Sequence, residues 1–314
     1  KFNMTKYFKI YILFLFFSLA GFSQISKVHY IPPLTNNKAL AGGSSIPLDQ
    51  YMYLSTPSEN NVTVTVTPLN GDSPTTYDNL NNDNPIRYDI GTSWNGSFTP
   101  SQLFVDHETT GGDTALNAGF VVEADCPIYV SVRYNAGAQA GALVSKGDAS
   151  LGTNFRAGMM TSGTIQIANP QPTSNNFFSV MATQDNTIVA IDLPNAIIGE
   201  TTLSNYNYQG PFTKVLQKHE SMILSMDFEN TNANNAGARN SLNGALIRSV
   251  DDNGTEDGTK PLVVNVGSAS GTFTSTGSGH DHGVDQIVGL DRVGHEYIFV
   301  RGNGQNTNDG GQLE

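Results

Sequence analysis

The sequence predicts an all-β protein made of tandem antiparallel, β-sandwich-like repeats, and three observations support this fold class. After Gln24, short runs of alternating apolar and polar residues stand between clusters of Gly, Pro, Asn and Asp, and no window has the apolar spacing of an amphipathic helix. Charged residues make up only 14% of the chain, against roughly 25% in soluble domains, which favours a loop-rich β protein. In addition, the apolar spacing of one half recurs in the other half.

The strand-length runs are the first of these observations. In residues 62–67, Val and Thr alternate, which places an apolar face and a hydroxyl face on one strand, as a half-buried antiparallel sheet requires. The other clear runs are 128–132, 178–181, 188–191, 222–226 and 262–266.

The repeat appears when Thr56 is set against Thr183. This offset of 127 aligns four apolar pairs, namely Tyr51 with Phe178, Tyr53 with Val180, Val62 with Val189 and Val64 with Ile191. Two further matches follow in the same order, residues 124–130 with 258–264 and residues 152–155 with 294–297. We therefore expect each half to close its own antiparallel core.

These matches divide the chain into segments. We expect a first β repeat at 24–150, a second at 151–290 and the start of an incomplete third at 291–314. A repeat of this length exceeds the roughly 20–50 residues of solenoid units, so each copy is interpreted as a β domain. A propeller-like arrangement of four-stranded units remains the structural alternative.

Residues 1–23 have the pattern of a secretory signal peptide. Lys6 and Lys9 precede an almost wholly apolar run at 10–22, and the small residue Ser23 offers a cleavage point. The run is shorter than the roughly 20 residues that a spanning helix needs. The pattern predicts export, and no transmembrane segment is expected in the mature fragment.

The charge balance restricts the expected partners, and the cysteine content restricts the means of stabilisation. Residues 1–23 hold three of the 16 basic residues and no acidic one, so the remainder carries 13 basic against 28 acidic residues. Such a field repels phosphate backbones, and nucleic acid is excluded as an expected partner. Cys126 is the only cysteine, so an internal disulfide is impossible. No cofactor is expected other than a bound Ca²⁺ ion.

A calcium site is one candidate. The ligand candidates, at the alternating spacing of a calcium loop, are Asp251, Asn253, Thr255 and Asp257. An EF-hand needs Gly at its sixth position and a carboxylate at its twelfth, where this chain has Glu256 and Leu262. A polar hairpin turn is therefore the favoured interpretation, and Ca²⁺ the alternative.

A second metal candidate lies at residues 279–285. In an extended segment His280 and His282 project to one face, and Asp285 is a candidate third ligand, the minimum for a catalytic zinc. The flanking Gly and Ser favour a loop with solvated histidines instead.

Catalytic motifs do not occur. There is no Gly-x-Ser-x-Gly elbow, no phosphate-binding Gly-rich loop that ends in Lys-Ser/Thr and no His-Glu-x-x-His helix. Cys126 has Lys260 as its counterpart in the second copy, which argues against a catalytic thiol. We expect no catalytic residues and no enzyme activity.

Seven stretches together carry a resemblance to a known family. They are HYIPPL at 29–34, DQYMYLSTPSENNVTVTV at 49–66, FVVEADCPIYVSVRYNAGAQAGALVSKG at 120–147, LGTNFRAG at 151–158, FSVMATQDNT at 178–187, KPLVVNVGSASGTF at 260–273 and DQIVGLDRVGHEYIFVRGNG at 285–304. This region resembles the N-terminal part of large surface proteins of gliding Bacteroidota, and it is similar to the N-terminal domain of IgGFc-binding proteins.

The resemblance implies a secreted, surface-exposed adhesion protein. Such proteins often end in a gliding-motility-associated C-terminal sorting domain for type IX secretion, which this sequence lacks. We predict a non-catalytic adhesin-type protein on the cell surface, outside the outer membrane, whose loops recognise an extracellular glycan or surface protein. A secreted hydrolase or carbohydrate-processing accessory module and a structural spacer of a larger adhesin remain the alternatives.

Overall fold

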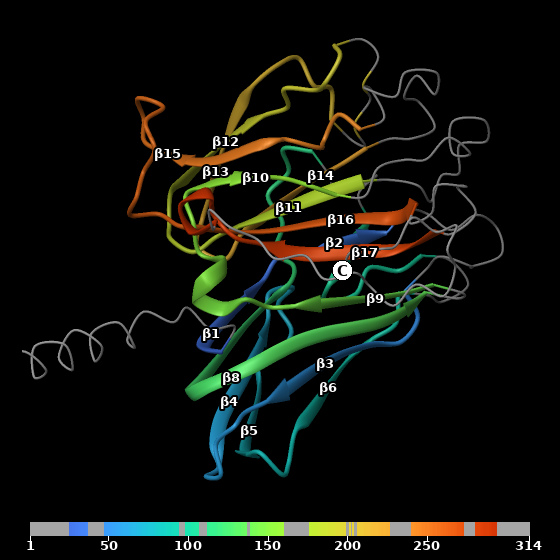
Figure 1. Cartoon of the computed structure of the whole chain (residues 1–314), viewed down its shortest axis with the longest axis vertical. Helices are drawn as coiled ribbons and strands as arrows, with labels where there is room; N and C mark the ends of the chain where they lie inside the picture. Colours follow the sequence, from blue (N-terminus) through green and yellow to red (C-terminus); the bar gives the residue numbers. More distant parts are fainter. Residues whose placement is uncertain are drawn as a thin grey trace, which may run out of the picture.

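The computed structural model describes residues 25–36, 47–93, 98–106, 112–136, 139–159, 176–198, 201, 203, 206–226, 240–272 and 280–293 (Figure 1). In these residues the protein is all-β, which confirms the predicted fold class, and its only helical segments are the 3₁₀ turns η1 (Gly147–Ser150) and η2 (Leu290–Arg292). The predicted signal peptide and nearly all of the predicted third copy lie outside the described residues, so both stay predictions.

The first half folds as a sandwich of two sheets that share one long strand. Its strands are β1 (Ser26–Ile31), β2 (Leu34–Asn36), β3 (Gln50–Ser55), β4 (Val62–Pro68), β5 (Thr75–Leu80), β6 (Ile86–Gly91), β7 (Phe104–Asp106), β8 (Phe120–Ala136) and β9 (Gln139–Val144). The first part of β8 pairs with β1 and β4, and its second part pairs with β3 and β9. The two sheets therefore run β5-β4-β8-β1 and β6-β3-β8-β9, while β2 and β7 form a separate parallel pair.

The second half repeats this strand order. Its strands are β10 (Asn154–Arg156), β11 (Asn176–Ala182), β12 (Thr187–Asp192), β13 (Phe212–Leu216), β14 (Ser221–Ser225), β15 (Leu246–Val250), β16 (Leu262–Thr272) and β17 (His280–Ile287). They form two sheets in the orders β13-β12-β15-β10 and β14-β11-β16-β17. Strands β15 and β16, with the turn between them, thus stand where β8 stands alone. Facing sheets rather than blades are formed, so the propeller alternative is not adopted. The exact limits of the two copies stay a prediction.

The two threonines that anchored the sequence comparison occupy matching positions. The Thr56 hydroxyl donates to the carbonyl oxygen of Pro127 at 3.1 Å, and the Thr183 hydroxyl donates to that of Pro261 at 2.6 Å. In both copies this bond ties the chain leaving β3 or β11 to the proline that precedes the next paired strand segment. Proline has no N–H to donate, so the ladder is interrupted there, and the threonine hydroxyl satisfies the carbonyl oxygen of the proline.

The strand register differs from the sequence alignment by one residue. Met52 pairs with Val132 and Leu54 with Val130, while Phe178 pairs with Val266 and Val180 with Val264. Since β8 and β16 match at an offset of 134, the structure matches Met52 with Phe178 and Leu54 with Val180. The alignment of Tyr51 with Phe178 and Tyr53 with Val180 is therefore wrong.

The one-residue difference in register decides which face of the sheet each side chain occupies. A one-residue change moves every side chain of a strand to the opposite face. Tyr51 and Tyr53 consequently lie on the outside of their sheet, whereas Phe178 and Val180 are fully buried in the core of the second sandwich.

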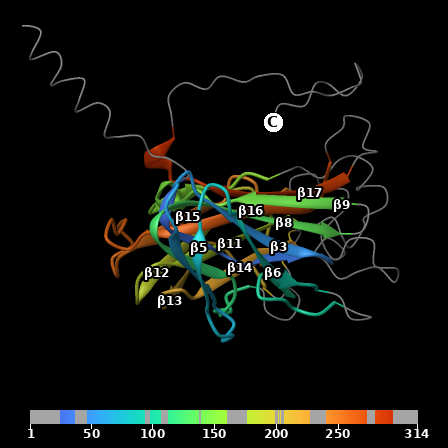
Figure 2. The same ribbon diagram turned by 90° about the horizontal axis from the view of Figure 1, so that it is seen from below.

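The two sandwiches are stacked and share buried surface (Figure 1, Figure 2). One face of the β14-β11-β16-β17 sheet contributes Phe178, Met222 and Leu224 to the second core. The opposite face contributes Phe177 and Ile223 to the core of the first sandwich. The expectation of one closed core for each half is therefore incomplete, because this sheet is buried on both sides.

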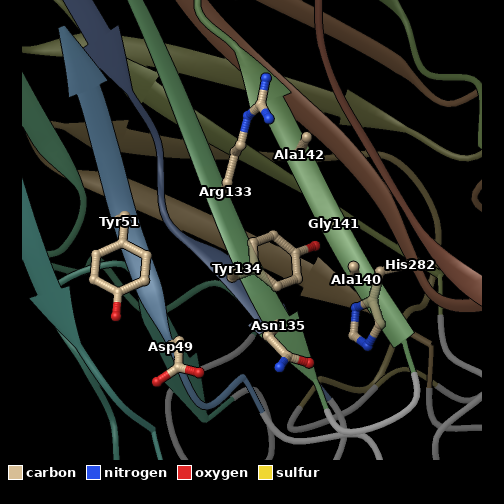
Figure 3. Close-up of a pocket in the computed structure, with 9 residues that line it drawn as sticks. All are labelled: Asp49, Tyr51, Arg133, Tyr134, Asn135, Ala140, Gly141, Ala142 and His282. Carbon is tan, nitrogen blue, oxygen red and sulfur yellow. The ribbon is translucent and has the colours of Figure 1, made fainter. Parts of the chain in front are cut away.

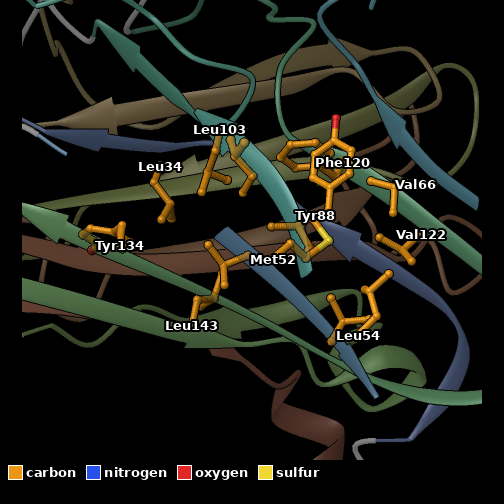
Figure 4. Packing of buried hydrophobic residues seen from close by; sticks show 14 of the residues in the cluster. Leu34, Met52, Leu54, Val66, Tyr88, Leu103, Phe120, Val122, Tyr134 and Leu143 are labelled. Atoms are coloured by element: carbon orange, nitrogen blue, oxygen red, sulfur yellow. The ribbon is translucent and has the colours of Figure 1, made fainter. Parts of the chain in front are cut away.

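The core of the first sandwich is built from side chains on alternate positions of facing strands (Figure 4). Ten of them are Leu34, Met52, Leu54, Val66, Tyr88, Leu103, Phe120, Val122, Tyr134 and Leu143. Burial of each large side chain contributes roughly 1.5–3 kcal/mol to the stability of the folded chain.

A buried amide joins the two sandwiches. The side-chain nitrogen of Gln286, on β17, donates to the backbone oxygen of Tyr30 at 2.8 Å, and its side-chain oxygen accepts from the backbone N–H of Lys146 at 2.7 Å and from the hydroxyl of Ser145 at 3.1 Å. Asn265 donates to the backbone oxygen of Pro32 at 2.9 Å. These bonds cross from the second sandwich to the first and set their relative position.

A buried histidine lies beside this joint. The two ring nitrogens of His29 contact the Ser145 hydroxyl at 3.0 Å and the carbonyl oxygens of Ile128 and Ser26 at 3.0 and 3.2 Å. Because carbonyl oxygens only accept, Nε2 carries a proton, and Nδ1 lies within hydrogen-bond distance of the Ser145 hydroxyl. Burial disfavours the charged ring and lowers the pKa of His29, although the two carbonyls and Asp148 act in the opposite direction.

We expect the protein to lose stability as the pH falls below about 6.5. The folded-state pKa of His29 is lower than the unfolded value of 6.5, so the unfolding free energy is at its full value above pH 6.5 and decreases as the pH drops towards the folded pKa. Urea denaturation between pH 7.5 and 5 measures this slope, because carboxylates titrate lower, near pH 4.

His29→Gln is expected to flatten the slope. His219→Gln is the matched control, because burial lowers the pKa of His219 in the same direction but this ring is only partly buried. A pH slope that is identical in the wild type and in His29→Gln contradicts the assignment.

Candidate ligand-binding site

The outer face of the β6-β3-β8-β9 sheet carries an exposed group of aromatic and cationic side chains, which we call the tyrosine–arginine face. Its members are Tyr51, Tyr53, Arg87, Tyr129 and Arg133. Tyr53 and Tyr129 are 38% and 41% exposed, which is unusual for side chains of this size on a central strand. The face arises because the intervening positions, such as Met52 and Leu54, point into the core and leave the odd-numbered ones outside.

Strand pairing arranges the face in rows. Tyr51 pairs with Asp89 on β6 and with Arg133 on β8, and the next row places Tyr53 between Arg87 and Ser131. Tyr129 lies opposite Ser55 in a third row. Each row crosses the sheet, so Tyr51 and Tyr53 lie along β3, with Arg87 on β6 and Arg133 on β8 at their sides.

The arginines contact the tyrosine rings diagonally. The guanidinium carbon of Arg87 lies 4.7 Å from the ring centre of Tyr51, and that of Arg133 lies 5.9 Å from the ring centre of Tyr53. The two rings meet edge to face at 6.4 Å. Each cation–π contact contributes about 0.5–1 kcal/mol at an exposed site, which helps to hold the guanidinium groups in place.

A cleft of about 500 Å³ opens at the end of this face (Figure 3). It is lined by Asp49, Tyr51, Arg133, Tyr134, Asn135, Ala140, Gly141, Ala142 and His282. Gly141 pairs with Tyr134, and a Cβ atom at Gly141 would lie 2.1 Å from the Tyr134 ring. The absence of a side chain there allows the ring to lie flat over β9 and to form the floor of the cleft.

The calcium candidates lie in the turn after β15. One side-chain oxygen of Asp251 accepts from the backbone N–H groups of Asn253 and Thr255, both at 2.9 Å. Asp257 accepts from the backbone and hydroxyl of Thr259, and these bonds lower the pKa of its carboxyl group. Both carboxylates thus stabilise their own turns, as the hairpin interpretation expects. These contacts do not favour calcium, which stays an untested prediction.

Of the zinc candidates, His282 and Asp285 do not lie on the same face of β17. His282 is buried, and its ring packs edge to face on Tyr134 at 5.5 Å. Asp285 lies on the other side of the strand and forms an ion pair with Lys146 at 2.8 Å. The side chain of His280 lies outside the described residues. Among the residues that the structure does describe, no group of three or more His, Cys, Asp and Glu side chains is placed to hold a metal ion.

Sequence reasoning did not identify the tyrosine–arginine face, because it assigned Tyr51 and Tyr53 to apolar core positions. The signal was present in the stretch QYMYLS, where Met52 and Leu54 alternate with two tyrosines. The same alternation on β8 turns Val132 into the core and Arg133 to the outside. Cys126 is exposed and lies in β8, between its two paired parts.

Comparison with known proteins places the second sandwich in a family. The family model described as IgGFc binding protein matches residues 140–312, more than half of the chain. The match includes the cleft residues on β9 and β17, whereas the tyrosine–arginine face precedes it. No curated protein matches the chain. No helix within the described ranges is both long and apolar enough to span a membrane.

Proposed function

The chain belongs to the IgGFc-binding protein family, and from this premise we propose that it is an extracellular adhesin-type protein that binds a protein ligand on the tyrosine–arginine face. The protein acts by binding alone and catalyses no reaction. Its β-sandwiches form a rigid support that holds the binding side chains in a fixed arrangement, which lowers the entropy lost on association.

One observation carries this proposal: the same face of the equivalent sheet is buried in the second sandwich. Strand pairing matches Tyr51 with Phe177, Tyr129 with Val263 and Arg133 with Gly267. Phe177 and Val263 are buried where the β14-β11-β16-β17 sheet packs on the first sandwich. The fold therefore uses this face for docking, and in the first sandwich the face is exposed.

The composition of the face also supports binding. Tyrosine and arginine are enriched among the residues that dominate the free energy of protein–protein association. Large exposed aromatic side chains on a rigid sheet offer contact area at a low cost in conformational entropy. A protein ligand fits the family description, and a glycan ligand is the alternative outcome.

Export and surface display belong to the proposal as well. Residues 1–23 carry the signal-peptide pattern, which supports export. Type IX export and a link to gliding motility rest on the family resemblance alone and stay predictions.

We expect Tyr53→Ala to weaken ligand binding at least about tenfold, because truncating a central aromatic contact costs on the order of 1–2 kcal/mol or more. The Fc fragment of immunoglobulin G, named in the family description, is the first protein to test, followed by arrays of extracellular proteins and glycans. Biolayer interferometry on residues 24–314 measures the affinity.

The matched control is Val215→Ala, which truncates a 49% exposed side chain on β13 of the second sandwich and should leave binding unchanged. Binding that is equal in Tyr53→Ala and the wild type would place the ligand elsewhere. Failure to bind any array member would favour the structural-spacer alternative.

A further inference from the structure

We propose that the protein bound at the tyrosine–arginine face presents an acidic surface, and that Arg87 and Arg133 each bind a separate carboxylate of it. This inference rests on the proposed function and specifies the chemistry of the partner. It follows from the lack of ion pairs to the two guanidinium groups within the described residues, from their positions on two strands and from a comparison with the second sandwich.

Neither guanidinium group has a hydrogen bond or ion pair with the part of the chain that the structure describes. Their contacts are the tyrosine rings. This is notable because the chain has 28 acidic and only 16 basic residues. A guanidinium presents five N–H donors in a planar fork that matches a carboxylate, so each arginine retains its full capacity for a bidentate ion pair.

One carboxylate in the same row of the face forms a hydrogen bond elsewhere. Asp89 lies in the same row as Tyr51 and Arg133, but its side-chain oxygen accepts from the backbone N–H of Gly91 at 2.9 Å. This bond holds the carboxylate towards the end of β6. The arginines are therefore available to a partner rather than neutralised within the sheet.

The two arginines lie on different strands and offer two positions for an acidic group. Arg87 and Arg133 lie on β6 and β8 with β3 between them, and they are two residues apart along the strand direction. Strand spacing and rise place their Cα atoms roughly 12 Å apart. Each guanidinium group lies over a different tyrosine ring, so a matching surface presents two acidic groups, one for each arginine.

The equivalent face of the second sandwich, on the β14-β11-β16-β17 sheet, has uncharged residues at the matching positions of β16. Where the first sandwich has Arg133, the second has Gly267, and where the first has Ser131, the second has Asn265. Asn265 donates to a backbone carbonyl of the first sandwich, and no cation faces the joint at these positions. A partner for the first sandwich meets two cations instead, and electrostatic complementarity requires it to be acidic.

The shape of the site favours a protein over a polysaccharide. The tyrosine–arginine face is an open sheet surface across β6, β3 and β8, whereas a chain of sugars is bound most fully in a groove. The adjoining cleft is short and touches only one end of the face (Figure 3). An acidic polysaccharide is therefore the competing outcome that the experiment must separate.

The test uses poly-L-glutamate as the acidic polypeptide and polygalacturonate as the acidic polysaccharide, each titrated into residues 24–314 in 150 mM salt. At this salt the screening length is about 8 Å, so the net charge of the chain is largely screened while contact ion pairs persist. We expect poly-L-glutamate to bind and the Arg87→Gln, Arg133→Gln double variant to bind at least about tenfold more weakly, with a reduced dependence on salt.

Two variants complete the design. Arg156→Gln removes an exposed arginine of the second sandwich that donates to the backbone oxygen of Gly244, and it should bind as the wild type does. Arg87→Lys with Arg133→Lys retains the charges but not the forked geometry, and an intermediate affinity is expected. Circular dichroism verifies that each variant is folded.

Three results would overturn the inference: no binding of poly-L-glutamate, equal binding by the Gln double variant, or binding of polygalacturonate alone. The proposed function is tested separately by Tyr53→Ala. If Tyr53→Ala weakens binding of the protein ligand and the Gln double variant does not, the result supports the proposed ligand site and contradicts the proposal of an acidic partner.

Discussion

Replacing Gly119 by alanine is expected to lower the free energy of unfolding by about 2–5 kcal/mol. Gly119 has a φ of +95° directly before β8, where an alanine is strained by about 1–2 kcal/mol. A Cβ atom there would also lie 2.2 Å from the backbone oxygen of Ile31, which is held in the β1–β8 ladder. Urea denaturation, monitored by far-UV circular dichroism, measures the change in the free energy of unfolding.

Gly71→Ala separates the two causes. Gly71 has the same φ of +95°, but no atom lies within 4 Å of a Cβ built there. This variant should lose only the backbone strain, about 1–2 kcal/mol. Equal losses in the two variants would show that the close approach of Ile31 does not contribute.

Gln286→Leu is expected to lower the free energy of unfolding by about 2–5 kcal/mol, because it leaves buried hydrogen-bonding groups unpaired at about 1–3 kcal/mol each. The groups are the backbone oxygen of Tyr30 and the backbone N–H of Lys146. Since these bonds join the two sandwiches, the variant is also expected to broaden or split the single unfolding transition that a shared core predicts.

The control is Gln209→Leu, which alters an exposed glutamine whose side chain donates only to Asn207 in the described residues. Its effect should stay within about 0.5 kcal/mol. A Gln286→Leu protein that unfolds with the wild-type midpoint would show that the sandwiches are held together by apolar contacts alone.

Local patterns predicted much of the fold. The alternation of residues 62–67 became β4, and the runs at 178–181 and 262–266 lie in β11 and β16. These predictions succeeded because alternation and turn residues are short-range properties. The joint of the two sandwiches was not predictable in this way, since Gln286 and Tyr30 lie far apart in the sequence and meet only in the folded chain.

The candidate site was less accessible to sequence reasoning. The expectation was that loops bind the ligand, and the acidic turn at Asp251 and the histidines of β17 were the residues singled out. The structure uses Asp251 to stabilise its own turn and packs His282 on an aromatic ring. Motif spacing describes which groups are near in sequence, whereas a binding surface on a sheet is assembled from several strands.

The sequence by itself determined that the chain is all-β, that two halves share one strand pattern and that Thr56 has a counterpart in Thr183, because each depends on neighbouring residues. Only the tertiary structure decided which sheet face is free. Tyr51 and Phe177 occupy equivalent strand positions, yet one is partly exposed and the other is buried. The difference arises because the first sandwich packs on the second sheet, whereas no described part of the chain packs on the outer face of the first sheet.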